Sequence, residues 1–190
     1  MYSQLFLILA STFFVVTAVP LHLESREPHP FDNPCFPIIS SPRTTAISPH
    51  GDLDKAWTIF ENDDLSIKNV TLRNAHDIYE GIKYNNNFVI SQTSGETINE
   101  FRFTSAVVDG IQHCIAGVSE TEIRDVPCDS DLAVWNVNCV KCGENGAAQE
   151  CSIRAHSSAT CAEVGEDGSI GLATCRTTLE GSEDQYWDIV

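Results

Sequence analysis

From residue 56 onward, short apolar runs of Val, Ile, Thr and aromatic residues alternate with clusters of Gly, Asn, Asp and Ser. No long stretch keeps apolar residues at the spacing of an amphipathic helix. Because β-branched and aromatic side chains favour strands, and the polar clusters favour turns, the pattern indicates many short strands. The sequence therefore predicts an all-β domain over residues 51–190.

Four of the expected strands begin with an aromatic residue and place an apolar residue two positions later. They are Trp57–Ile59, Phe101–Phe103, Trp135–Val137 and Trp187–Ile189. Side chains two positions apart lie on the same face of a strand, and large rings commonly anchor a core. The intervals between these strands also share an order of shorter apolar runs, which predicts three copies of about four strands each.

Cysteine spacing supports the repeat. Cys114 and Cys128 are 14 positions apart, and so are Cys161 and Cys175, at corresponding places in the second and third copies. We expect each pair to form a disulfide, which closes a loop of about 15 residues and stabilises the fold by about 3 kcal/mol in the chain-entropy model.

The other four cysteines are Cys35, Cys139, Cys142 and Cys151, and they allow three pairings. The favoured one joins Cys142 to Cys151 across a short loop, and Cys35 to Cys139 as a tether for the N-terminal segment. The spacing of Cys139 and Cys142 also suits half a zinc site or a redox motif. No second ligand pair at metal-binding spacing accompanies it, so structural disulfides and no metal are expected.

The N-terminal fifty residues differ in composition from the rest. Residues 5–16 are almost all apolar and are followed by small residues up to Ala18, which predicts a signal peptide over residues 1–18. This run is too short to span a bilayer of ~30 Å. Residues 19–50 hold seven of the eight prolines and are expected to form an extended Pro-rich arm. With the N-glycosylation sequon at Asn69, these features predict a secreted, extracellular protein.

The formal net charge of −16 excludes some classes of function. A nucleic-acid-binding protein needs a basic face that neutralises phosphates, and an anionic membrane surface repels an acidic protein. The histidines lack the spacing of a metal hydrolase, and the chain has neither a Gly-x-Ser-x-Gly nucleophile motif nor a phosphate-binding glycine loop. We therefore expect no enzyme activity and no cofactor.

Residues 50–190 resemble the ricin B-type lectins, a β-trefoil family whose repeat closes on a Gln-x-Trp motif. The third copy carries the resemblance best, through Cys161-Ala-Glu-Val, Leu172-Ala-Thr-Cys175 and Gln185-Tyr-Trp187. The second copy keeps its cysteines and Trp135, with Ala133 in place of the glutamine. In the first copy, Asn99 and Phe101 stand in for the motif. The resemblance implies a β-trefoil of three pseudo-repeats.

The resemblance also implies where a sugar would bind. Members of the family use an Asp after the first strand cysteine, an aromatic ring two residues before the second cysteine, and an amide pair before the Trp. Carried onto the third copy, these positions predict Glu163, Asp184 and Gln185 as carbohydrate-binding residues, whereas Ala173 stands where the ring belongs. The second copy has Ala116 and Val126 at the first two positions and loses the amide pair.

Two classes of function follow. The first is a secreted, non-catalytic lectin that binds glycans through the third copy. The second is a secreted trefoil that binds an extracellular protein, as a protease inhibitor or an effector, because one fold hosts both uses. A ring over the surface of Glu163 and Gln185 favours the lectin, and a projecting apolar loop over residues 74–87 favours the protein-binding alternative.

Overall fold

The computed structural model describes residues 34–37, 43–61, 70–76, 83–93, 99–108, 111–176 and 183–190. Within these ranges the chain forms strands and three-residue 3₁₀ turns, as expected for an all-β protein. The expected signal peptide at 1–18, the glycosylation site at Asn69 and most of the Pro-rich arm lie outside the described residues. The described part contains no helix that is long and apolar enough to cross a membrane.

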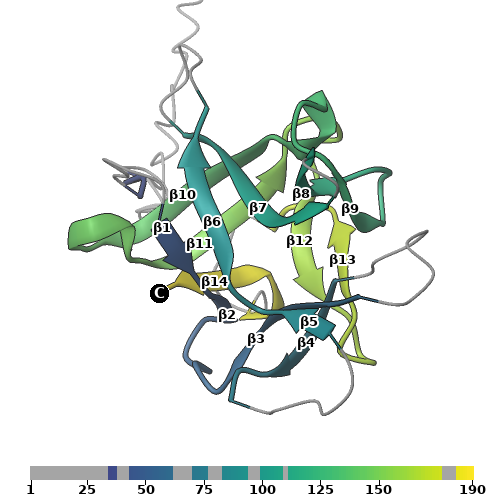
Figure 1. The fold of residues 1–190 in the computed structure, drawn as a ribbon. Coiled ribbons are helices and arrows are strands. Elements are labelled where there is room, and N and C mark those ends of the chain that lie inside the picture. Colours follow the sequence, from purple (N-terminus) through teal and green to yellow (C-terminus); the bar gives the residue numbers. More distant parts are fainter. Residues whose placement is uncertain are drawn as a thin grey trace, which may run out of the picture.

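Six strand positions form a closed barrel. The strands are β1 (Arg43–Thr45) with β2 (Ile47–Pro49), β6 (Phe88–Gln92), β7 (Glu100–Val108), β10 (Trp135–Cys142), β11 (Ala148–Ala155) and β14 (Tyr186–Ile189). They pair antiparallel in the order β1–β6–β7–β10–β11–β14–β2 (Figure 1). Between β1 and β2, Ala46 exchanges two backbone hydrogen bonds with Val190, so β1 and β2 act as one interrupted strand that closes the ring.

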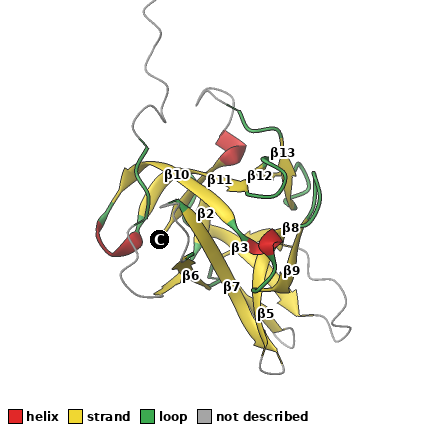
Figure 2. Cartoon of the chain, turned by 90° about the horizontal axis from the view of Figure 1, so that it is seen from above, coloured by secondary structure: helices red, strands yellow, loops and turns green. Residues whose placement is uncertain are grey.

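Three hairpins cap one end of this barrel. They are β3 (Lys55–Glu61) with β4 (Val70–Asn74), β8 (Ile111–Gly117) with β9 (Ile123–Pro127), and β12 (Cys161–Val164) with β13 (Ile170–Ala173). β5 (Lys83–Asn85) adds to the edge of β3. The Leu72 N–H donates to Gly168 O at 2.8 Å and the Leu172 N–H to Thr121 O at 3.1 Å, so the three hairpins contact one another. Figure 2 shows β8 with β9 and β12 with β13 in a view turned by 90° from that of Figure 1.

The strand registers reveal the threefold repeat and correct its first copy. Trp135 pairs with Phe101, and Trp187 pairs with Cys151, each on the first strand of its own repeat. In the first repeat the residue at this place is Phe88, which pairs with Thr45 on β1. The expectation that Asn99 and Phe101 replace the motif of the first copy is therefore wrong: Asn86 and Phe88 do, and Phe101 begins the second repeat.

The three tryptophans meet in the core. Trp57, which belongs to a hairpin strand, has its ring centroid 6.4 Å from that of Trp135 and 5.0 Å from that of Trp187, in edge-to-face contacts. All three side chains are fully buried. The Nε1 groups of Trp135 and Trp187 donate to the carbonyls of Ile115 and Ala162 at 2.8 and 3.1 Å, so each repeat-closing Trp binds the hairpin of its own repeat. This is the β-trefoil arrangement that the resemblance implies.

The domain begins earlier than the sequence indicated. β1 and β2 lie within residues 19–50, which were expected to form an arm, yet they supply the first barrel strand. The prolines frame this strand: Pro42 precedes it and Pro49 is its last residue, while residues 43–48 contain none. Proline is tolerated at the end of a strand because only an interior position needs its N–H for the ladder.

Four disulfides stabilise the fold. Cys114–Cys128 and Cys161–Cys175 form as expected, and each links the first strand of a hairpin to the loop that follows its second strand.

The expected pairs Cys142–Cys151 and Cys35–Cys139 are wrong, because the bridges are Cys35–Cys142 and Cys139–Cys151. The register of β10 with β11 explains this. It places Cys139 directly opposite Cys151, and Cys142 opposite Ala148. The backbone of Cys35 does pair with that of Cys139, but its sulfur reaches Cys142.

Candidate functional site

The structure brings the three expected carbohydrate-binding residues together. Glu163 lies on β12, while Asp184 and Gln185 lie in the 3₁₀ turn η3 (Glu183–Gln185) that leads into β14. The Gln185 Nε2 donates to Glu163 Oε2 at 2.6 Å and to Thr174 O at 3.0 Å, and its Oε1 accepts from the Arg176 N–H at 2.9 Å. Gln185 is only 3% exposed, so this amide connects β12, the loop after β13 and η3 from inside.

Arg176 completes the cluster and was missed by the sequence analysis. Its Nη1 donates to Asp184 Oδ1 at 2.7 Å and its Nη2 to Glu163 Oε2 at 3.1 Å. The side chain is 41% exposed, and those of Asp184 and Glu163 are 37% and 23% exposed. The only signal that could have found it is its place directly after Cys175, whose disulfide to Cys161 fixes the chain beside β12.

The ring of a typical sugar site is absent from the described part of this cluster. Ala173, on β13, stands at the position of the aromatic ring in the family and pairs with Cys161 on β12. Tyr186 is buried and does not supply a ring at the surface. In the second repeat the corresponding residues Ala116 and Ala133 are fully buried beside Cys114, which leaves no polar group there. The partly exposed carboxylates of Glu163 and Asp184 are therefore the part of the expected site that this chain retains at the surface, together with Arg176.

Replacing Gln185 by Ala is expected to lower the free energy of unfolding by about 2–3 kcal/mol. The change removes three hydrogen bonds of a buried amide, one of them to a carboxylate, and leaves the Thr174 carbonyl and the Arg176 N–H without this partner. Chemical denaturation of the purified protein measures the loss, with Gln149→Ala on an exposed stretch of β11 as the control. A Gln185→Ala protein as stable as the wild type would contradict this structural role.

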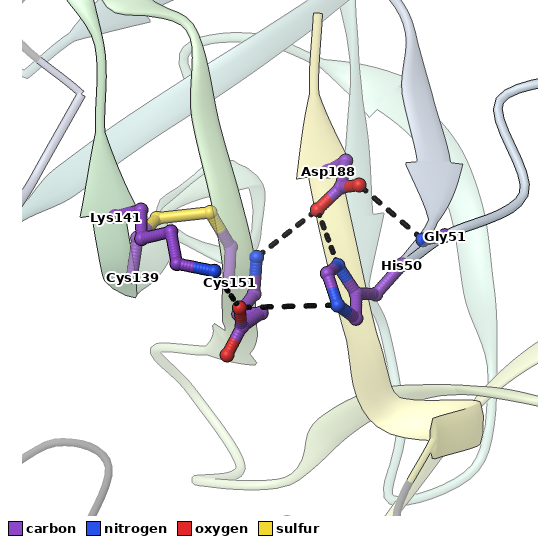
Figure 3. A network of polar contacts seen from close by, with 7 residues as sticks. His50, Gly51, Cys139, Lys141, Cys151 and Asp188 are labelled. Carbon is purple, nitrogen blue, oxygen red and sulfur yellow. Dashed lines mark hydrogen bonds and ion pairs between the residues drawn. A yellow bond between two sulfur atoms is a disulfide. The ribbon is translucent and has the colours of Figure 1, made fainter.

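A second polar network lies where β14 meets β2 and β11 (Figure 3). The buried Asp188 carboxylate accepts from Glu150 N–H at 3.0 Å and Gly51 N–H at 3.4 Å, and lies 2.9 Å from Nδ1 of His50. Figure 3 shows His50 and Asp188 pointing toward one another beside the Cys139–Cys151 disulfide. A carboxylate with this many partners is satisfied within the protein, and the network is structural.

Glu150 has an uncommon backbone conformation in this network. Its φ is +53°, and the pairing of β11 with β14 shifts register between Ala148 and Cys151, which marks a β-bulge. The bulge directs the Glu150 N–H at Asp188. The carboxylate of Glu150 accepts a hydrogen bond from Lys141 Nζ at 2.6 Å, and this bond, with the charge of Glu150, raises the pKa of Lys141.

A third group joins Ser105, His113 and Asp125 at the base of the β8–β9 hairpin. The Ser105 hydroxyl donates to Asp125 Oδ1, and the Nδ1 of His113 lies 2.8 Å from Asp125 Oδ2. In a Ser-His-Asp relay the histidine stands between the other two and takes the serine proton. Here the aspartate stands in the middle, so the arrangement does not activate the serine. The described residues also contain no group of three His, Cys, Asp or Glu side chains that could hold a metal ion.

Comparison with known proteins identifies the fold. No family model and no curated protein matches this chain. Among solved structures it is similar to the BEL β-trefoil, at 16% identity over 82% of this chain and 99% of that one, with a TM-score of 0.51. It is also similar to the Polyporus squamosus lectin bound to the human-type influenza-binding epitope Neu5Aca2-6Galb1-4GlcNAc, at 11% identity over 80% of this chain and 50% of that one, with a TM-score of 0.52.

Toxins share the fold as well. The cytolethal distending toxin of Haemophilus ducreyi aligns over 76% of this chain and 80% of its own, at 18% identity and a TM-score of 0.50. The chain spans only half the length of the Polyporus lectin it matches. At these identities the likeness establishes the β-trefoil fold, which agrees with the barrel, the hairpins and the meeting of the tryptophans described above.

Proposed function

We propose that the protein is a secreted, non-catalytic lectin of the ricin B type, which binds glycans through its third repeat. The observation that carries the proposal is the grouping of two partly exposed carboxylates and a guanidinium, from Glu163, Asp184 and Arg176, on one surface held by a buried amide. Carboxylates accept hydrogen bonds from neighbouring sugar hydroxyls and a guanidinium donates to them, which is how polar groups fix the orientation of a ligand. The lectins among the structural neighbours support the same class of function.

The same geometry supports a non-catalytic role. Hydrolysis of a glycosidic bond needs two carboxyl groups on opposite sides of that bond, one acting as acid and the other as nucleophile or base. Here Glu163 and Asp184 both accept hydrogen bonds from the guanidinium of Arg176, so the two carboxyl groups lie on one side of the surface. Because the described part of the cluster holds no ring for the apolar face of a sugar, we expect weak binding of single sugars and a dependence on multivalent display.

A glycan array with protein secreted from a eukaryotic host tests the proposal. We expect binding to a defined set of glycans, and a reduction of tenfold or more with Asp184→Asn and Arg176→Gln, because each loses a charge-assisted hydrogen bond of the cluster. These two residues are partly exposed, so their replacement leaves the buried Gln185 in place. Glu166→Gln, on the exposed turn between β12 and β13, is the matched control.

Equal binding by wild type and both variants would exclude the third repeat as the sugar site. Absence of binding to every glycan would remove the lectin function and direct the search to the alternative, an extracellular protein partner. The loop expected to project for that purpose, residues 74–87, lies partly outside the described residues.

A further inference from the structure

A pocket of about 500 Å³ lies away from the third-repeat cluster, at the junction of the second and third repeats. It is lined by side chains from four segments that follow or begin barrel strands, chiefly Thr93, Glu100, Arg102, Asp131, Val134 and His156. We call it the seam pocket. Its volume lies in the range that small-molecule sites occupy, and its lining is divided between polar and apolar surface.

The threefold repeat relates this pocket to the network of Asp188. His156 follows the residue that pairs with Trp135, as His50 follows the residue that pairs with Trp187. Their N–H groups donate to equivalent carbonyls at 3.1 and 2.9 Å. Each histidine also faces a glutamate on the strand beyond the Trp strand: His156 Nδ1 lies 3.5 Å from Glu100, and His50 Nε2 lies 3.9 Å from Glu150.

Two positions differ between the seam pocket and the equivalent junction of the third and first repeats, which holds the Asp188 network. The junction of the Asp188 network has the buried Tyr186 one residue before Trp187. The seam pocket has Val134 one residue before Trp135, and valine is the smaller side chain. One residue after the Trp, the junction of the Asp188 network has the carboxylate of Asp188, whereas the seam pocket has Asn136, which carries no charge. The seam pocket therefore has a smaller apolar residue before its Trp and an uncharged residue after it.

Arg102 is the residue that points to a ligand. It stands two positions after Glu100 on β7, hence on the same outward face, because Phe101 and Phe103 face the core. Its Nε is buried and has no hydrogen-bond acceptor among the described residues. A buried N–H of a guanidinium without an acceptor is costly, and a bound anionic group would satisfy it.

The carboxylates of the pocket limit the charge of that ligand. Glu100 binds Thr93 Oγ1 at 3.3 Å and faces His156, and its carboxylate is 15% exposed. Asp131 adds a second carboxylate to the lining. Two carboxylates repel a multiply charged anion such as phosphate, but they accept hydrogen bonds from hydroxyl groups.

We propose that the seam pocket binds a sugar that carries a single anionic group, with Arg102 pairing to that group and Glu100 and Asp131 accepting from ring hydroxyls. Val134 supplies an apolar wall for the carbon face of the ring. The anionic group is a carboxylate or a sulfate, since both present the paired oxygens that a guanidinium binds. This site is separate from the third-repeat cluster, so it stands or falls independently of the function proposed above.

Calorimetric titration of the full chain with three disaccharides tests the proposal: a uronate, a sulfated sugar and their neutral parent. We expect at least tenfold tighter binding of one charged sugar than of the neutral one, because the Arg102 pair is charge-assisted. The uronate arm and the sulfate arm identify which anionic group the pocket accepts. Equal affinity for the charged and neutral sugars, or no binding of any of them at millimolar concentration, would overturn the proposal.

Variants locate the binding. Arg102→Gln is expected to remove the preference for the charged sugar, whereas Arg124→Gln on the β8–β9 hairpin makes the same charge change outside the pocket and should keep it. Val134→Tyr places in this seam the ring that the other seam carries, and is expected to abolish binding with every charged group of the pocket still present. Unchanged binding in a folded Val134→Tyr protein, or equal competition by inorganic sulfate, would contradict a sugar site here.

Discussion

Replacing Trp187 by Ala is expected to lower the free energy of unfolding by about 3–5 kcal/mol, the range for truncating a buried aromatic to alanine. Trp187 is fully buried and contacts Trp57 at 5.0 Å between ring centroids. Its indole also donates to the Ala162 carbonyl of the β12–β13 hairpin. The variant therefore loses the packing of the core and one link between the barrel and its cap. Chemical denaturation followed by tryptophan fluorescence and circular dichroism measures the effect.

A comparison of phenylalanine variants separates packing from hydrogen bonding. Trp135→Phe and Trp187→Phe each remove a donor from a buried carbonyl, whereas the Nε1 of Trp57 has no hydrogen-bond partner among the described residues. We expect Trp57→Phe to cost about 1 kcal/mol less than either of the others, the typical net value of one hydrogen bond. Equal losses in all three variants would show that the indole donors contribute nothing.

Replacing both Cys35 and Cys142 by Ser removes their bridge and is expected to lower the free energy of unfolding by about 5 kcal/mol, the value of the chain-entropy model for so long a loop. The two residues are 107 positions apart, and their bridge ties the segment before β1 to the end of β10. Denaturant titration of the double variant under oxidising conditions, which keep the other three disulfides closed, measures this loss.

The Cys114–Cys128 pair is the internal comparison for that experiment. It closes a loop with a separation of only 14, for which the same model gives about 3 kcal/mol. A smaller loss for the Cys35–Cys142 variant than for the Cys114–Cys128 variant would indicate that the native contacts of residues 34–37, and not the length of the loop, decide the contribution of the long bridge.

The β-trefoil fold could be predicted from the sequence because the same local motifs recur in successive repeats. Trp135 and Trp187 begin equivalent strands, and the hairpin cysteines of the second and third repeats share one spacing. The first repeat was misassigned because a period of two looks the same in a barrel strand and in a hairpin strand. Trp57 belongs to the second kind, and Phe88, the true counterpart of the closing tryptophans, lies in a strand with a smaller aromatic.

Long-range geometry was out of reach. The partners of Cys139 and Cys142 depend on the register of the β10–β11 hairpin, which one residue of loop length would change. Glu163 and Gln185 could be located because a motif marks each, but Arg176 carries no such mark and reaches them only through the folded loop. The seam pocket draws on residues from 93 to 157, and the sequence does not show that they share one surface.

The way the barrel closes has a consequence for how the chain acquires its structure. β14 pairs with β2 and also with β11, so the strand that completes the ring joins residues near 48 to residues near 188. Contacts so distant along the chain form late and slowly, because the intervening loop must lose its freedom first. During synthesis, β2 and β11 stay as open edges until residues 186–189 have been made, and unpaired edges invite pairing with other chains. The long Cys35–Cys142 bridge attaches the segment before β1 to the end of β10, so the N-terminal strand stays tied to the barrel while its partner β14 is still missing.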